Sequence, residues 1–379
     1  MLLRNFMGLA VLAVMLFLSA VPAGAQDTIA RQAILVDFNT GAVLLEKNAD
    51  QRMPPSSMSK IMTAYMLFEK LKRGDVRMTD EFTVSERAWR MGGSKMFVMV
   101  GTRVKVEDLI RGIIIQSGND ACVVVAENLA GTEEAFAEQM NRRARELGLK
   151  DSNFRNATGW PDPDHYMTAR DLAILAKRLI TDFPEYYHFY KELNFTYNGI
   201  RQGNRNPLLY QNIGADGLKT GHTEEAGYGL TASVVRGDRR LILVVNGLRS
   251  MNERGQETGR LMDYGFREFE NYALFKKGDN IDKAPVWLGA EASVPLVMER
   301  DVVMTMPRRA RPQMKVVAQF EGPVPAPVAK GDPIGKLVIS APGVTALEVP
   351  LVAGGSVDRL GLFGRVGAAL RHLVWGSNA

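Results

Sequence analysis

Three serines precede a lysine in Pro-Pro-Ser-Ser-Met-Ser-Lys, residues 54–60, and an apolar series typical of a buried helix follows at once. Pro54-Pro55 ends the preceding segment, and we predict a helix from about Ser57 to Arg73. On helical spacing, Ser56 and Ser57 precede Lys60 by four and three positions, and either could share its face. Ser59, the immediate neighbour of Lys60, is expected to point off this face and to tolerate alanine. Helical spacing alone leaves Ser56 and Ser57 as equal partners of the lysine.

The rest of the first 275 residues combines hairpin and helix patterns. Residues 33–48 and 227–248 each hold two apolar runs around a polar turn, which predicts two antiparallel hairpins. Between them, apolar spacing predicts four helices, over 106–116, 121–129, 132–147 and 168–180. Thr168 and Asp171 open the last of these as a capped helix start. This order predicts an α/β (α+β) fold, with helices packed around an antiparallel sheet.

The composition changes near residue 276. The residues from Lys276 to Pro285 are rich in turn signals and predict a linker, and short apolar runs between prolines and glycines then predict a small all-β domain over 276–355. Residues 356–379 place apolar side chains on one helical arc and charged ones opposite. We predict that they form an amphipathic helix lying on a membrane surface. The alternative is a helix that docks on the protein itself.

The first 25 residues have the pattern of a secretory signal. They carry one charge, Arg4, then an apolar run over 6–21 and the small residues Ala23-Gly-Ala25. This pattern predicts cleavage before Gln26, with an uncleaved membrane anchor as the alternative. Either outcome predicts that the protein is exported.

Composition excludes several classes of function. The formal charge of +5 is spread over 379 residues without basic blocks, so we expect no nucleic-acid partner. None of the four histidines has metal-site spacing and no glycine-rich phosphate loop is present, so no metal or cofactor is expected. The single cysteine, Cys122, excludes an intramolecular disulfide and is predicted to be a small buried core residue.

Three short motifs in a meaningful order remain: Ser57-Met-Ser-Lys60, Ser117-Gly-Asn119 and Lys219-Thr-Gly221. Each is weak alone, and Ser250-Met-Asn252 matches the second by chance. Their placement adds more, because the first opens a helix, the second joins two helices and the third leads into a strand pair. The first motif also favours Ser57 over Ser56, which is left as a cap or loop residue.

This set supplies what acyl transfer needs. A serine hydroxyl becomes a good nucleophile when a neutral lysine one helical turn away takes its proton. A second lysine, Lys219, together with the positive helix end, would lower the pKa of Lys60. The backbone N–H groups of Ser57 and His222 could then stabilise the oxyanion. The alternative for Lys60 is an ordinary solvated surface lysine.

With these motifs the chain resembles the low-molecular-mass penicillin-binding proteins of the serine D-alanyl-D-alanine carboxypeptidase family. The resemblance covers roughly residues 30–375 and includes further phrases: Gln116–Cys122, His165–Asp171, Asn204-Arg-Asn206, Asp216–Thr223, Ala226-Gly-Tyr228 and Gly247-Leu-Arg249. It implies a penicillin-recognising fold over 26–275 that removes the terminal D-alanine from peptidoglycan stem peptides. It also implies a location on the periplasmic face of the cytoplasmic membrane and acylation by β-lactam antibiotics.

The resemblance also assigns roles to residues. Ser57 would form the acyl-enzyme and Lys60 would be its base. Ser117 and Asn119 would relay protons and hold the peptide amide, with Lys219 beside them. The substrate-binding residues would be Thr220, Gly221 and His222 on a strand edge, with Arg205 and Arg254, and less readily Arg249, for the substrate carboxylate.

Two alternatives stay open at this point. A class A-like β-lactamase shares the serine–lysine pair but needs a deacylating glutamate, and Tyr190 stands four residues before Asn194, where that glutamate is required. A catalytically silent peptidoglycan-binding protein could keep the fold without the activity. The sequence also leaves open whether cross-linked stems are cut.

Overall fold

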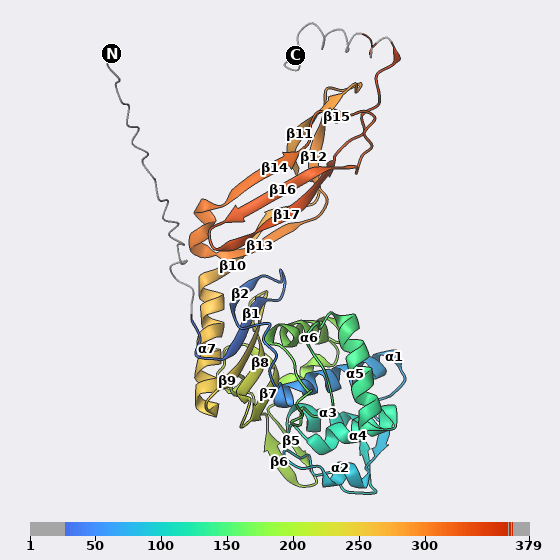
Figure 1. Cartoon of the computed structure of the whole chain (residues 1–379), viewed down its shortest axis with the longest axis vertical. Helices are drawn as coiled ribbons and strands as arrows, with labels where there is room; N and C mark the ends of the chain where they lie inside the picture. The colour runs from blue at the N-terminus through green and yellow to red at the C-terminus, as the bar shows by residue number, and fades with distance from the viewer. Residues whose placement is uncertain (1–26, 363, 365, 367–379) are drawn as a thin grey trace, which may run out of the picture.

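The computed structural model describes residues 27–362, 364 and 366 (Figure 1). The predicted signal segment and most of the predicted amphipathic helix lie outside these residues. At the centre of the first unit is an antiparallel sheet in the order β2-β1-β9-β8-β7. Its strands are β1 (Gln32–Asp37), β2 (Val43–Lys47), β7 (Ala215–Thr223), β8 (Gly227–Arg236) and β9 (Arg239–Leu248). Both predicted hairpins are therefore confirmed.

Helices cover both faces of this sheet. The helices are α1 (Lys60–Arg73), α2 (Glu86–Arg90), α3 (Val106–Ile114), α4 (Asn119–Ala130), α5 (Glu133–Leu147), α6 (Ala169–Asp182) and α7 (Met251–Glu268). Two separate two-stranded antiparallel sheets are formed by β3 (Glu81–Thr83) with β4 (Arg103–Lys105), which α2 separates in the chain, and by the hairpin of β5 (Asn194–Tyr197) and β6 (Ile200–Gly203). The four predicted helices are confirmed within two residues at each end. At the start of α6, Thr168 Oγ1 accepts the Asp171 N–H at 3.0 Å, as predicted.

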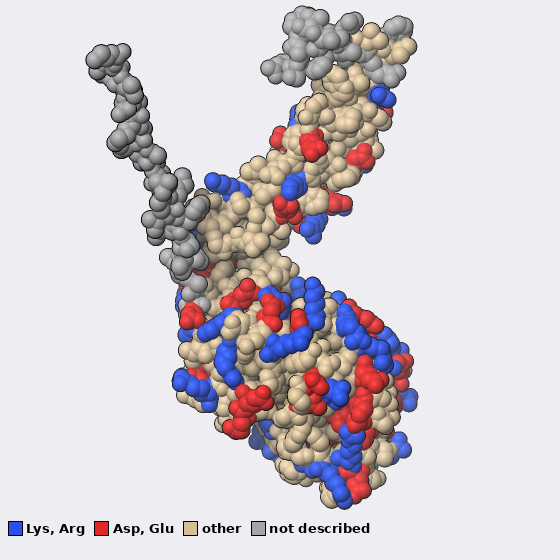
Figure 2. All heavy atoms as spheres, viewed as in Figure 1, with Lys and Arg blue, Asp and Glu red and all other residues tan. Residues whose placement is uncertain are grey.

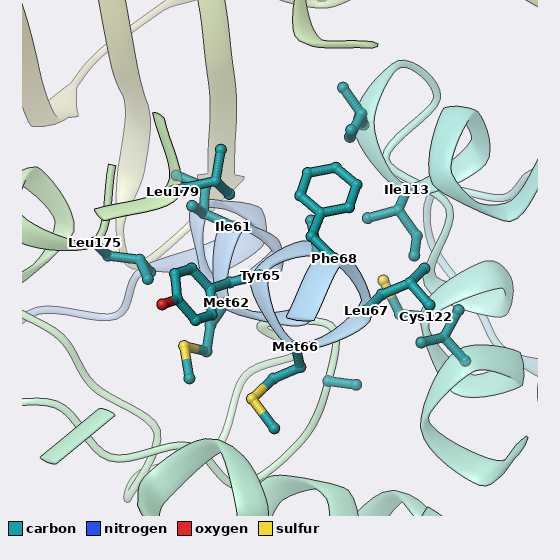
Figure 3. Packing of buried hydrophobic residues seen from close by; sticks show 14 of the residues in the cluster. Ile61, Met62, Tyr65, Met66, Leu67, Phe68, Ile113, Cys122, Leu175 and Leu179 are labelled. Atoms are coloured by element: carbon teal, nitrogen blue, oxygen red, sulfur yellow. The ribbon is translucent and has the colours of Figure 1, made fainter. Parts of the chain in front are cut away.

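Alternating strand residues supply two hydrophobic cores. Ile34 packs among α1–α6, whereas its neighbour Leu35 packs on the opposite face with α7. Figure 3 shows α1 at the centre of the first core, with apolar side chains leaving it in all directions. From Lys60 to Phe68 this helix is buried all round. Cys122 lies in this core and is fully buried, as predicted.

The C-terminal unit is built from strands. A six-stranded sheet in the order β14-β16-β17-β12-β11-β15 lies beside the pair β10–β13. Its strands are β10 (Phe269–Phe275), β11 (Asn280–Trp287), β12 (Ser293–Met298), β13 (Val302–Pro307), β14 (Lys315–Phe320), β15 (Val324–Pro325), β16 (Pro333–Ala341) and β17 (Val344–Ala353). This agrees with the predicted all-β character. Figure 1 shows the unit extending away from the helix-covered sheet.

Two boundaries differ from the sequence prediction. Strand β10 pairs with β13, and its Tyr272 and Leu274 pack on the core of the C-terminal unit, so strand pairing there begins at Phe269 and not at 276. The predicted linker from Lys276 to Pro285 is wrong: residues 276–279 form a turn between β10 and β11, and the rest of the segment lies in β11 and pairs with β12. Val357, placed in the predicted helix, is instead buried and exchanges backbone hydrogen bonds with Val328 at 2.8 and 2.9 Å.

The surface carries both signs of charge. In Figure 2, lysine and arginine alternate with aspartate and glutamate over the visible face of the first unit, without a large basic field. Among the described helices, none is both long and apolar enough to cross a bilayer.

Candidate active site

The three serines of the first motif have three different partners. They form a 3-10 turn, Ser56–Ser59, that leads into α1. The Ser57 hydroxyl lies 2.9 Å from Nζ of Lys60, whereas the Ser56 hydroxyl donates to Thr223 Oγ1 at 3.5 Å. Ser59 Oγ lies 2.8 Å from Nε2 of His165. The structure therefore pairs Ser57, and not Ser56, with the lysine.

The predicted tolerance of Ser59 to alanine does not follow from this arrangement. Its side chain does point off the face of Lys60, but Ser59 is fully buried and hydrogen-bonded to His165. Removing a buried hydroxyl leaves its partner without a hydrogen bond, which costs about 1–3 kcal/mol. Ser59 therefore contributes to stability.

Lys60 is buried, and its amine is within hydrogen-bonding distance of three oxygen atoms. Its Nζ lies 2.9 Å from Ser57 Oγ, 2.7 Å from Asn119 Oδ1 and 2.6 Å from the Thr158 carbonyl oxygen. Burial lowers the pKa of Lys60 to about 8, and the positive charge of Arg205 acts in the same direction. The largest cause of the lowered pKa is thus loss of solvation, whereas the sequence analysis had attributed it to the neighbouring Lys219 and the positive helix end. The solvated alternative for Lys60 is excluded, since its side chain is 1% exposed.

The second motif faces this amine across the start of α4. Asn119 accepts from Lys60 and donates from Nδ2 to the Gly92 carbonyl at 2.8 Å, which fixes the orientation of its amide. Ser117 adopts a φ of 60°, and its buried hydroxyl has no hydrogen-bond partner in the described part of the chain. A buried hydroxyl without a partner is unusual and is available to a ligand.

The third motif lies on β7, the edge strand of the sheet, which packs against the serine turn. Lys219 and Thr220 are buried, and Lys219 Nζ lies 3.4 Å from the Thr220 carbonyl oxygen. Burial holds the pKa of Lys219 well below its usual value, and the charge of Lys60 adds to this. A Cβ at Gly221 would lie 2.8 Å from the Pro55 carbonyl oxygen, so only glycine lets the strand approach the turn.

The remaining predicted residues surround the same region. Arg254 is buried, donates to the Arg205 carbonyl oxygen at 3.4 Å, and its Nε has no partner among the described residues. Exposed Arg205 donates to Ser94 Oγ at 2.6 Å. His222 is exposed and stacks on Tyr228, with ring centroids 3.9 Å apart. Arg249 instead forms an exposed ion pair with Glu253 and has a carboxylate partner already.

Two further groups shape the site and were not predicted. The buried carboxylate of Asp120 accepts the backbone N–H groups of residues 96, 97 and 98 at 2.8, 2.8 and 3.2 Å, which ties this loop to α4. The Thr158 carbonyl belongs to a turn over 156–160 whose Asn-x-Thr-Gly sequence is a turn signal. That signal predicts a turn, but it does not reveal that the turn reaches Lys60.

A half-buried serine paired with a buried lysine, in a turn that packs against the edge strand of a helix-covered antiparallel sheet, defines a penicillin-recognising serine acyl-transfer enzyme. Residues 19–250 match the family model of D-alanyl-D-alanine carboxypeptidases, and residues 269–359 match the C-terminal domain of penicillin-binding protein 5. The chain belongs to the D-alanyl-D-alanine carboxypeptidase family.

Individual relatives agree with this assignment. The chain is 40% identical over 345 residues to D-alanyl-D-alanine carboxypeptidase DacA of Escherichia coli, which covers 89% of this chain and 86% of that protein. Penicillin-binding protein 5 from Haemophilus influenzae is 39% identical, with a TM-score of 0.78 over 88% of this chain and 99% of its own. An ampicillin-bound penicillin-binding protein D2 from Listeria monocytogenes is 30% identical, with a TM-score of 0.58 over 62% of this chain and 97% of its own.

Proposed function

We propose that this chain removes the terminal D-alanine from peptidoglycan stem peptides through an acyl-enzyme on Ser57. Its family makes it a serine-type D-Ala-D-Ala carboxypeptidase and a penicillin-binding protein. The observation that most supports the residue roles is the setting of Lys60, which is buried, has a lowered pKa and lies 2.9 Å from the Ser57 hydroxyl. Purified mature protein should release D-alanine from a peptide ending in D-Ala-D-Ala.

In the acylation step, Ser57 Oγ attacks the carbonyl carbon of the terminal peptide bond while neutral Lys60 takes the hydroxyl proton. The tetrahedral oxyanion is stabilised by the backbone N–H groups of Ser57 and His222. The C–N bond then breaks and the leaving D-alanine amine takes up a proton, and we assign the relay of this proton to the Ser117 hydroxyl, which has no hydrogen-bond partner among the described residues. Water hydrolyses the ester and releases the shortened stem peptide.

The cations around the serine suit a substrate that ends in a carboxylate. Within the described part of the chain, Lys60, Lys219 and Arg254 donate hydrogen bonds only to uncharged oxygen atoms. Buried positive charge without a carboxylate partner favours an anionic ligand. We assign the substrate carboxylate to Arg254 and Arg205, with Thr220 and Gly221 lining the strand edge. A β-lactam would acylate Ser57 in the same way and persist, because its leaving amine stays tethered and blocks the water.

A β-lactamase activity has less support. Glu192, in the loop that superficially resembles the deacylation loop, forms an ion pair with Arg111 at 2.8 Å. Tyr190 occupies the position where the glutamate is required and is fully buried. Slow release of a bound penicillin is therefore expected. Product analysis by mass spectrometry on intact and cross-linked stems would separate carboxypeptidase from endopeptidase activity.

The acylation rate should depend on pH through Lys60. The base acts only when neutral, and with a pKa of about 8 its neutral fraction rises as the pH rises. We expect the second-order rate of labelling by a fluorescent penicillin to increase about tenfold from pH 7 to pH 9. Thermal unfolding at each pH serves as the control for stability. A flat profile with intact protein would contradict Lys60 as a base of this pKa.

We further propose that the protein is exported and that its C-terminal residues attach it to the outer face of the cytoplasmic membrane. Because residues 357 and 359 bridge to the β-rich unit, a deletion of 361–379 keeps these contacts. This deletion should move the mature protein from the vesicle fraction to the supernatant in a sedimentation assay with anionic lipid. Penicillin labelling of the truncated protein is the control for folding. Equal sedimentation of both forms would rule out attachment by this segment.

A further inference from the structure

The base Lys60 depends on a peptide group that lies outside the three motifs. A neutral amine has two N–H groups and one lone pair, and the oxygen atoms of Asn119 and Thr158 can only accept hydrogen bonds. With both N–H groups committed to them, at 2.7 and 2.6 Å, the lone pair faces the Ser57 hydroxyl. Without the Thr158 acceptor, one N–H could turn toward Ser57, and the base would lose its orientation.

One side chain holds this peptide group. Asn156 Oδ1 accepts three successive backbone N–H groups, from Thr158 at 3.1 Å, Gly159 at 2.8 Å and Trp160 at 3.0 Å, and also the Thr158 hydroxyl at 3.0 Å. Its Nδ2 donates to the Trp160 carbonyl at 3.0 Å. The peptide group between Thr158 and Gly159 therefore gives its N–H to Asn156 and its carbonyl to Lys60. In a trans peptide these two groups point in opposite directions, so fixing one fixes the other.

The turn could rotate this peptide group if Asn156 released it. Gly159 has a φ of 76°. Turns that have a positive φ at their third residue differ from turns that do not mainly by a rotation of the peptide group between the second and third residues, which here is the group between Thr158 and Gly159. The turn also packs directly on the residue before the nucleophile, since a Cβ at Gly159 would lie 1.8 Å from the Ser56 carbonyl oxygen. Packing thus sets where the turn lies, while Asn156 sets which way the Thr158 carbonyl points.

We propose that Asn156 is a positioning residue for the base: by holding the peptide group between Thr158 and Gly159, it directs the lone pair of Lys60 at Ser57. This inference rests on the proposed function, in which Lys60 is the general base. Asn156 does not contact the reacting atoms, and its effect is expected on the rate and pH dependence of acylation and not on the identity of the labelled serine.

The test compares two variants by their second-order rates of acylation with a fluorescent penicillin across pH 6–10. Asn156→Ala should lower the maximal rate about 100-fold, the scale of a small misplacement of a catalytic group, and move the acid limb to lower pH because the ammonium form loses an acceptor. Asn156→Asp keeps the oxygen acceptors and should recover most of the maximal rate. Its added negative charge should move the acid limb to higher pH.

Asn153→Ala is the matched control, because it removes an asparagine contact to the Asp164 carbonyl in the same segment without touching the turn at 158. Its acylation should equal that of the unmodified protein. Absence of label on the unmodified protein would reject the proposed function itself. If that protein is labelled, unchanged rate and pH profile in folded Asn156→Ala, or an unshifted acid limb in Asn156→Asp, would overturn the role of Asn156 alone.

Discussion

Replacement of Ser57 by alanine is expected to abolish covalent labelling by a fluorescent penicillin and release of D-alanine. The hydroxyl is the only atom of this residue that can form the ester, and it is the one that lies 2.9 Å from the Lys60 amine. The turn that contains Ser57 packs on the rest of the protein through the backbone carbonyl groups of Pro55 and Ser56. The loss of the Ser57 hydroxyl should therefore leave the fold intact. Gel fluorescence, with intact-protein mass spectrometry to find any residual adduct, measures the result.

The matched control is Ser59→Ala, two residues away in the same turn. Its hydroxyl contacts His165 and not Lys60, so the variant should still be labelled. It should unfold at a lower temperature, because it loses a buried hydrogen bond. Full labelling of Ser57→Ala, or loss of labelling in folded Ser59→Ala, would contradict the choice of Ser57 as nucleophile.

Replacement of Lys60 by methionine is expected to lower the acylation rate by about 10²–10⁴-fold, the usual contribution of a general base. Methionine keeps much of the side-chain volume and is compatible with a site that is 1% exposed. The rate should also lose its rise through pH 8, since the titrating amine is gone. Stopped-flow measurement of penicillin acylation, with the variant in excess, gives the rate at each pH.

Lys72→Met provides the comparison on the same helix. Lys72 is a half-exposed residue near the end of α1, 3.7 Å from Glu185, and takes no part in the site. Its replacement should leave both rate and pH profile unchanged. If Lys60→Met acylates as fast as Lys72→Met, the base must be sought elsewhere, and Lys219 would be the next residue to replace.

The sequence predicted those parts of the fold that have strong local signals. Hairpins and amphipathic helices follow from apolar spacing and from caps such as Thr168. Helix α7 was missed because its apolar spacing is interrupted by Gly255, Gly259 and Gly265. The structure gives a reason for Gly265: a Cβ there would lie 2.7 Å from Leu241 Cδ1, so the glycine lets the helix pack closely on the sheet. Ser250, judged a chance motif, is the N-cap of this helix.

The same distinction applies to the site. The sequence motifs predicted the serine–lysine pair and the residues that surround it, because the chemistry of these side chains depends on residue type. The Thr158 carbonyl escaped notice because every residue has a carbonyl group, and this one reaches Lys60 across 98 positions. Burial as the main cause of the lowered Lys60 pKa is likewise a property of the folded core, which no short motif encodes.

The two glycines beside the serine turn have a consequence for the energetics of the reaction. Gly221 packs against the carbonyl group of Pro55 and Gly159 against that of Ser56, where added Cβ atoms would lie 2.8 and 1.8 Å away. The nucleophile is therefore immobilised when the chain folds, before any substrate arrives. The nucleophile therefore loses its conformational freedom when the chain folds and not during catalysis. We expect acylation to have a small activation entropy.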